Sequence, residues 1–247
     1  MGLTEADLKL LPEGVQPIDK ETVFRFSCHK DLDCFTECCR LLELTLTPYD
    51  MLRLCRATGL SSTAFLHQYV IVEEPAEEFF PQLFLTMLDD GRASCPFVSP
   101  NGCTVYPNRP SACRAYPLGR ACRPLASGLS NEDFILVREP HCHGFTGDVQ
   151  QTAEQYCSNQ GLAVYNKFND IIASLLKHPG IHERGPLESE EKDLFMLLLY
   201  DMDQFRKAMA ENLVAEITPI TTNFLLSKSE EDLLLWAVDW LKQRLFS

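Results

Sequence analysis

The stretch Cys28-His-Lys-Asp-Leu-Asp-Cys34-Phe-Thr-Glu-Cys38-Cys39 places four thiols within twelve residues. Thiols this close converge on one ion where the backbone loops tightly, and such short spacings allow it. Adjacent cysteines normally point apart, so Cys38 and Cys39 either serve different sites or one of them only packs. Because the spacing is dense and the neighbouring residues are polar, the segment predicts a metal site rather than buried free cysteines.

Two further groups of metal-binding residue types lie downstream. Cys95-Pro-Phe-Val-Ser-Pro-Asn-Gly-Cys103 is followed by Cys113 in a looped, proline-rich frame, and a third group is His141-Cys142-His143-Gly144. The histidines that we consider as ligands or proton carriers are His29, His141 and His143.

The chemistry of these groups favours a metal. A thiolate ligand must lose its proton, and a nearby cation makes that loss easier. Tetrahedral sulfur sites suit zinc or an iron–sulfur cluster, and the ligand type alone does not separate the two. The chain has 11 cysteines, an odd number that fits poorly with complete disulfide pairing. Cys55 and Cys157 lie in apolar helical patterns and are expected to pack, whereas Cys122 is ambiguous.

Composition excludes several other classes of protein. The 22 basic and 35 acidic residues give a net charge of −13, which argues against broad binding of nucleic acid. No apolar run reaches the ~18 residues of a membrane-spanning helix. The first twenty residues carry acids and no continuous apolar stretch, unlike a secretory signal. We therefore expect a cytoplasmic protein in a reducing compartment, without a membrane partner.

One segment runs against this acidic balance. Residues 91–131 contain no Asp or Glu but five arginines. Four thiolates around a divalent ion leave a net charge of −2, which arginines would offset. Arginines also bind carboxylates and phosphates in a bidentate manner, so binding of an anionic cofactor stays open, with Arg109, Arg114 and Tyr116 as the candidate residues. The five arginines are Arg92, Arg109, Arg114, Arg120 and Arg123.

The expected fold is α+β and mainly α-helical. Capping residues predict helices at 47–58 and 62–72, and helical spacing of apolar residues predicts helices over 156–176, from Ser189 to Leu213, and after the capping box of Ser229 and Asp232. Short strands are expected at 23–26, 84–88 and 134–137, and 95–128 is expected to be loop-like. We predict a metal-stapled, cysteine-rich loop core in a chelating domain over residues 1–147. A helical bundle over residues 148–247 is expected to pack on it.

The chain also resembles a known family. The residues that carry the resemblance are the run from Cys28 to Cys39, the helix start Leu-Thr-Pro-Tyr-Asp-Met, and Gly-Cys103-Thr-Val-Tyr-Pro-Asn-Arg109-Pro-Ser-Ala-Cys113-Arg-Ala-Tyr116-Pro. Over residues 22–147 they resemble the YkgJ-type cysteine-cluster family, a zinc- or iron-chelating domain that includes proteins similar to flagellin lysine N-methylase. The resemblance implies that the chelating set is Cys28, Cys34, Cys38, Cys39, Cys95, Cys103, Cys113 and Cys142.

Eight thiols exceed one tetrahedral site, so they build either two four-coordinate sites or one cluster with spare thiols. Two functions follow from this. The first is a metal-binding protein that holds zinc or iron, including an iron–sulfur cluster. The second, implied by the resemblance, is an iron–sulfur-dependent methyltransferase that uses S-adenosylmethionine on lysine of a protein substrate. The chain contains no Cys-x-x-Cys pair, which disfavours a thiol oxidoreductase.

Overall fold

The computed structural model describes residues 11–124, 130–214, 217 and 219–246. It is 47% helical and 16% strand, with small sheets, which confirms the predicted mainly helical α+β class. The chain packs as two compact units that alternate along the sequence. Unit 1 comprises residues 1–42, 89–104 and 111–164, and unit 2 comprises residues 43–88, 105–110 and 165–247. The predicted domain boundary after residue 147 stays a prediction.

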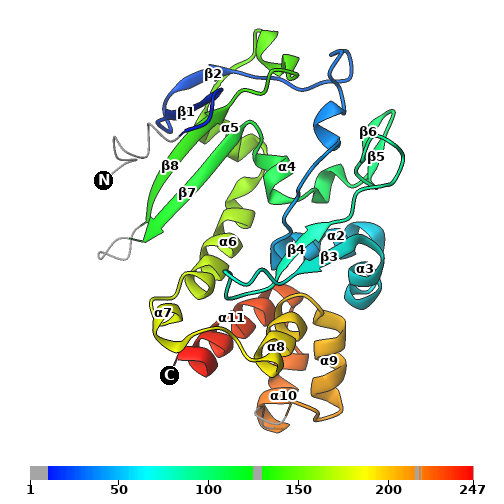
Figure 1. The fold of residues 1–247 in the computed structure, drawn as a ribbon, viewed down its shortest axis with the longest axis vertical. Helices are drawn as coiled ribbons and strands as arrows, with labels where there is room; N and C mark the ends of the chain where they lie inside the picture. The colour runs from blue at the N-terminus through cyan, green and yellow to red at the C-terminus, as the bar shows by residue number, and fades with distance from the viewer. Residues whose placement is uncertain (1–10, 125–129, 215–216, 218, 247) are drawn as a thin grey trace. The chain divides into compact units, whose positions relative to one another are not determined.

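Unit 1 contains most of the strands (Figure 1). Its antiparallel sheet has the order β1-β8-β7, in which Leu136 is opposite both Gln16 of β1 and Leu118 of β7. Two small antiparallel pairs, β2 with β9 and β5 with β6, complete its strands in the described part of the chain. The bounds are β1 Val15–Ile18, β2 Val23–Arg25, β5 Val98–Ser99, β6 Gly102–Cys103, β7 Leu118–Pro124, β8 Ser130–Val137 and β9 Gln150–Thr152.

The helical elements of unit 1 are short, because turn and capping residues interrupt them. They are the 3₁₀ turns η1 (Glu37–Cys39) and η3 (His143–Thr146), and the helices α4 (Ser111–Ala115) and α5 (Ala153–Asn159). Thr152 and Gln155 form a capping box that starts α5 directly after β9. Helix α6 (Leu162–Leu176) begins in unit 1 and continues into unit 2.

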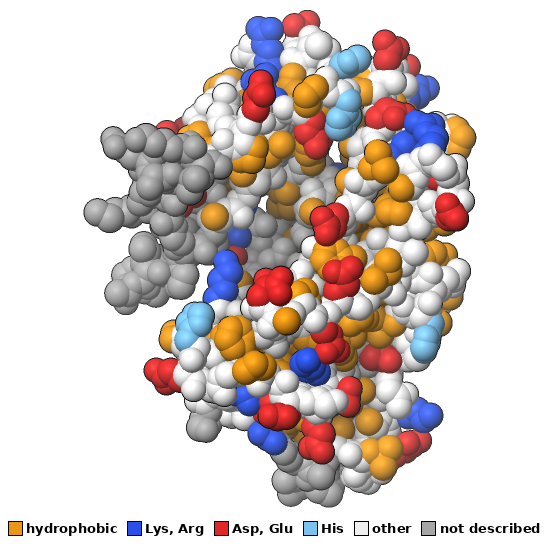
Figure 2. All heavy atoms as spheres, in the orientation of Figure 1, with side chains coloured by type: hydrophobic (Ala, Val, Ile, Leu, Met, Phe, Trp, Pro, Cys, Tyr) orange, Lys and Arg blue, Asp and Glu red, His pale blue; other side chains and the backbone are white. Residues whose placement is uncertain are grey.

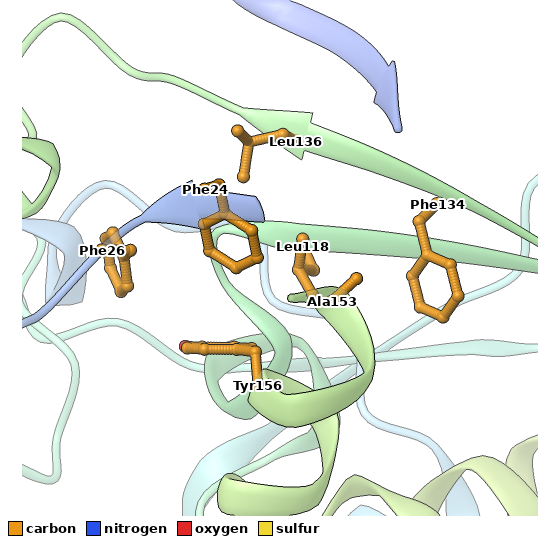
Figure 3. Packing of buried hydrophobic residues seen from close by; sticks show 7 residues of the cluster. All are labelled: Phe24, Phe26, Leu118, Phe134, Leu136, Ala153 and Tyr156. Carbon is orange, nitrogen blue, oxygen red and sulfur yellow. The ribbon is translucent and has the colours of Figure 1, made fainter. Parts of the chain in front are cut away.

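The core of unit 1 forms between its strands and α5. In Figure 3 the side chains of Phe24 and Leu118 point from their strands toward Ala153 and Tyr156 of α5. Leu136 and Ala153 are fully buried, and the ring centroids of Phe24 and Tyr156 lie 5.8 Å apart. Alternate strand residues therefore turn to one face and pack on the helix, as the pleat of a half-covered sheet requires.

Unit 2 is a helical bundle with one β-hairpin. Helix α8 packs on α9 and α11, and α11 also contacts α2. The Tyr49 ring stacks on the Phe168 ring at 4.1 Å, and both rings are buried. The bounds are α2 Pro48–Thr58, α3 Ser62–Tyr69, β3 Val70–Glu73, β4 Gln82–Leu85, η2 Tyr106–Asn108, α7 Ile181–Arg184, α8 Ser189–Leu199, α9 Met202–Ala210, α10 Pro219–Leu226 and α11 Glu230–Phe246.

Several predicted boundaries are wrong. The segment expected to be loop-like contains β7, β5 and β6, and the helix expected over 62–72 ends at Tyr69, after which the chain continues as β3. The helix expected from Ser189 to Leu213 is divided into α8 and α9. The Asp201 carboxylate accepts a hydrogen bond from the Gln204 N–H and caps a new helix there.

The surface reflects the net charge of −13. Figure 2 shows acidic side chains spread over the face drawn there, with apolar side chains between them. None of the helices in the described ranges combines the length and apolarity that crossing a membrane requires. The cytoplasmic location stays a prediction.

Candidate metal centre

The first cysteine segment folds into consecutive tight turns. The Glu37 N–H donates to the Cys34 carbonyl and the Cys39 N–H donates to the Thr36 carbonyl, both at 3.0 Å. Thr36 has φ of 70°, in the left-handed region that β-branched residues rarely adopt. Such a conformation costs about 1–3 kcal/mol, and it persists where the surrounding structure fixes it. These turns keep Cys34, Cys38 and Cys39 on one short, looped piece of backbone.

Main-chain bonds join this segment to the second cysteine group. The Cys95 N–H donates to the Cys39 carbonyl at 2.8 Å, and the Leu41 N–H donates to the Ala93 carbonyl at 2.9 Å. The Arg40 guanidinium also donates to the Ser94 hydroxyl. Cys39 and Cys95 are 56 positions apart in the sequence, yet they are neighbours across this short antiparallel contact.

Charged side chains reinforce the same contact. Arg92 donates to both oxygens of the Glu37 carboxylate, at 2.8 and 3.0 Å. Within the segment that leads to Cys95, the Asp90 carboxylate accepts hydrogen bonds from the N–H groups of Arg92 and Ser94. We call Glu37, Arg40, Arg92 and Ser94 the clamp, because they hold the two cysteine-bearing segments together through side chains as well as backbone.

The third group also reaches the first segment. The His143 N–H points to the Cys34 sulfur at 3.2 Å, across 109 positions of sequence. The Ser27 N–H donates to the Gly144 carbonyl at 2.8 Å, which fixes the start of the first segment against η3. This contact places the backbone of the third group directly beside the sulfur of the first segment.

Cys103 approaches through a close backbone contact. Gly102 has φ of 105°, and a Cβ at this position would lie 3.1 Å from the ring of Phe35. Glycine therefore permits both the left-handed backbone of the β5–β6 hairpin and the approach of Phe35, the residue after Cys34. Residues 102 and 103 thus lie beside the first cysteine segment.

The thiols affect one another electrostatically. The Cys39 thiol donates to the Cys38 sulfur and lowers the pKa of Cys38 to about 7. The same bond, followed by burial and by the charges of Cys38, Cys95 and Cys113, raises the pKa of Cys39. Burial and then the Cys103 charge raise the pKa of Cys95. Thiolates in one region repel each other in the metal-free protein, and a bound cation removes that repulsion.

Cys142 lies at the edge of this region. It packs against the hydrophobic core of unit 1, next to Tyr116. Burial and then the Cys142 sulfur raise the pKa of Tyr116, whose buried hydroxyl has no well-formed hydrogen bond within the described residues. This poorly bonded hydroxyl places a buried polar group beside a thiol at the edge of the cysteine segments.

The donor set is not assembled into a closed site. Within the described ranges, no three His, Cys, Asp or Glu side chains are placed as a group to hold a metal ion. Cys28, Cys38 and Cys113 are exposed. The imidazoles of His29 and His141 face Asp31 and Glu139, each at 3.6 Å. The sulfur donors suit a thiophilic ion, and the bonds between their segments keep them in one region. Their side chains would have to move together to coordinate such an ion.

The arginines of residues 91–131 whose side chains the structure describes make structural contacts. Arg114 is 8% exposed and donates to the Gln160 carbonyl at 2.5 Å in unit 1. Arg109 belongs to unit 2, where it donates to the Tyr106 carbonyl at 2.8 Å and covers the Tyr106 ring. Arg120 pairs with Glu132 at 2.7 Å. The side chains of Cys122 and Arg123 lie outside the described residues. The expected cofactor-binding role of Arg109, Arg114 and Tyr116 stays a prediction.

The two cysteines expected to pack lie on helices. Cys157 of α5 is partly buried against the core of unit 1, and Cys55 is half-buried on α2 in unit 2. Burial, followed by the Asp203 carboxylate, raises the pKa of Cys55 to about 12. Cys55 is the one cysteine of the chain outside unit 1.

The fold and these thiols define a mainly helical protein in which cysteines from three sequence segments belong to one unit. Residues 27–143, just under half of the chain, match the CxxCxxCC family model, described as a "putative zinc- or iron-chelating domain". The match supports the resemblance of this segment to a cysteine-cluster family. Comparisons with curated proteins and with solved structures found no match, so a similarity to methylases is not shown.

Proposed function

We propose that unit 1 chelates zinc or iron through cysteine thiolates drawn from its three cysteine segments. The observation that carries the proposal is the pair of bonds between these segments, Cys95 to Cys39 and His143 to Cys34. The family match supplies the class of ion. The interactions described above involve Cys34, Cys38, Cys39, Cys95, Cys103, Cys113 and Cys142, and Cys28 completes the set of eight candidates.

A bound ion would act on the fold first. Because the three cysteine segments come together only in the folded chain, the free energy of metal binding would add to the free energy of folding of unit 1. Zinc would act as a structural ion or as a Lewis acid, and iron would permit a sulfur cluster. Colour and metal content of the purified protein distinguish these options. A brown, iron-containing protein would support the cluster, and a colourless one with zinc would exclude it.

The first test replaces one ligand. We expect Cys113→Ser to lower the metal content per chain and the thermal midpoint together, because the lost thiolate weakens both binding and folding. Metal content measured by mass spectrometry, with a thermal melt of the same sample, checks this. Cys55→Ser is the matched control and should keep its metal. Full metal content with unchanged stability in Cys113→Ser would contradict a role for this thiol.

The methyltransferase alternative is not part of this proposal. It would require S-adenosylmethionine and a lysine-bearing protein substrate. Its candidate anion-binding residues, Arg109 and Arg114, make main-chain contacts that serve the local fold. Titration of the metal-loaded protein with S-adenosylmethionine would reopen it if binding were measured.

A further inference from the structure

Strand β3 in unit 2 leaves an apolar edge open. It pairs with β4 in a two-stranded sheet, and within the described residues no other strand covers its second edge. Ile71 is 48% exposed and Val72 is 44% exposed. Exposed apolar edge strands are usually shortened, charged or covered, because an unpaired edge is a template for another strand.

The main-chain groups of Val72 point to this open edge. The register places Val72 opposite Leu83. The Leu83 carbonyl accepts a hydrogen bond from the Leu46 N–H at 2.8 Å, on the side away from β3. In an antiparallel ladder, residues of such a pair direct their N–H and C=O groups away from each other. Val72 therefore presents an N–H and a C=O outward, and no described residue bonds to either.

A groove of about 340 Å³ lies beside the edge. Its apolar lining includes Leu66 of α3, Val70 and Val72 of β3, and Met196 of α8, with Asp201 among the polar groups. Residues opposite each other on neighbouring strands point to the same face. A strand added to β3 would therefore turn every second side chain into this groove, whose volume lies in the range of ~300–1,000 Å³ typical of binding pockets.

The charge around the edge selects the kind of strand. Glu73, Glu74, Glu77 and Glu78 are all exposed as the chain leaves β3. Lys192 pairs with Glu74 at 2.8 Å. We propose that β3 and this groove bind an extended segment of a partner protein, with apolar residues at alternate positions next to Lys or Arg. A second copy of this chain fits less well, since each copy carries a net charge of −13.

A random peptide library displayed on phage and panned on the full chain tests this proposal, which does not depend on the metal site. We expect the selected peptides to alternate apolar residues and to carry Lys or Arg. Their affinity, measured by fluorescence anisotropy of the synthetic peptides, should fall about tenfold with Val72→Pro. This variant removes the outward N–H but no bond to β4. Added salt should also weaken binding.

Two variants keep the test decisive. Val72→Lys keeps the backbone N–H and places a charge at the groove, so it should lose peptide binding. This variant tests the groove independently of whether Val72→Pro folds. Ile71→Thr changes the opposite face of the strand and should bind normally. The proposal would be overturned by selected peptides that lack the alternating basic pattern, by no enrichment, or by folded Val72→Pro and Val72→Lys variants that bind the peptides as tightly as the parent chain does. A dimer that Val72→Lys dissociates would instead identify a second copy as the occupant.

Discussion

At the scale of single residues, the clamp joins the two segments that carry Cys38, Cys39 and Cys95. Arg92 and Glu37 are exposed, so their ion pair adds little to the stability of the fold. Their position matters more, because they join the segments of Cys38 and Cys95. Groups that orient metal ligands without touching the metal commonly affect metal affinity.

We therefore expect Arg92→Gln to weaken metal binding a few-fold while the melting point of the metal-free chain changes little. Arg92→Lys keeps the charge, so its metal affinity should lie between that of the parent chain and that of Arg92→Gln. High salt should reduce these differences in affinity. Competition with a chromophoric chelator measures the affinity. Lys192→Gln removes an ion pair of the same length in unit 2 and should leave metal affinity unchanged. Equal effects of Arg92→Gln and Lys192→Gln would contradict the clamp.

Cys55 gives a prediction about pH. Burial and Asp203 raise its pKa from 9.0 to about 12, so the folded chain holds this proton more tightly than the unfolded chain. The protonated Cys55 thiol therefore contributes to the stability of the folded chain. This contribution is complete below pH 9 and is lost as the pH rises toward 12. In urea unfolding, the loss of stability between pH 8 and pH 10 should be smaller for Cys55→Ala than for the parent chain.

The same burial makes Cys55 unreactive. At pH 8 in the folded, metal-free protein, iodoacetamide should modify the exposed Cys28 and Cys113 but not Cys55. Peptide mass spectrometry identifies the modified sites. Rapid modification of Cys55 before unfolding would show that its thiol is not protected.

At the scale of elements, the start of α2 depends on a reciprocal cap. The Asp50 N–H donates to the Thr47 hydroxyl oxygen at 3.2 Å, and the Thr47 N–H and hydroxyl donate to the buried Asp50 carboxylate. Removing the Thr47 hydroxyl removes a hydrogen bond to a buried charge. The loss in free energy of unfolding should therefore lie in the upper part of the range usual for a helix cap, about 0.5–2 kcal/mol.

We expect Thr47→Ala to lower the free energy of unfolding accordingly, as measured in urea, and Thr47→Ser to keep most of it. Ser229→Ala is a matched comparison at α11, where the cap is exposed and should cost less. If Thr47→Ala were neutral, the capping box would not hold α2 in place.

These caps also show how far sequence patterns predict the elements. Thr47 with Asp50, and Ser229 with Asp232, have local signatures, so the starts of α2 and α11 were predictable. The break between α8 and α9 was obscured because apolar spacing continues through Asp201, although Asp201 followed by Gln204 is itself a local capping signal. Strand β7 was missed because it depends on pairing with the distant β8.

For the candidate site, spacing predicted the cysteine segments but not the bonds that join them. The contact of Cys39 with Cys95 depends on a two-stranded pairing with no sequence signature. Gly144 is a second example, since a Cβ there would lie 2.5 Å from the ring of Phe26. Glycine after the His-Cys-His group therefore serves packing in the core, which only the three-dimensional structure reveals.

At the scale of the whole molecule, the proposed metal ligands lie in one unit and the tryptophans in the other. Every candidate ligand lies in unit 1, and Trp236 and Trp240 both lie in α11 of unit 2. Parts of one protein open with different free energies, and a ligand stabilises the folded form of the part that it binds. A chelator should therefore speed amide exchange in η1, β5 and β6 more than in α8 to α11.

Hydrogen exchange with mass spectrometry, run on the full chain with and without chelator, measures this difference. The thermal midpoint reported by tryptophan fluorescence, which follows unit 2, should change little on metal removal. Amide exchange in unit 1 should become clearly faster. An equal loss of protection in both units would show that the ion stabilises the chain as one cooperative body.

The alternation of the two units also sets an order of events during synthesis. A ribosome that has made Cys39 must add the whole first block of unit 2 before it makes Cys95, 56 residues later. At about 5–20 residues per second, this takes roughly 3–11 s. During that time the four earliest thiols are without their downstream partners, exposed to oxidants and to competing ions. During this interval, the oxidation state and metal occupancy of these four thiols depend on the surrounding cell rather than on the fold of the chain.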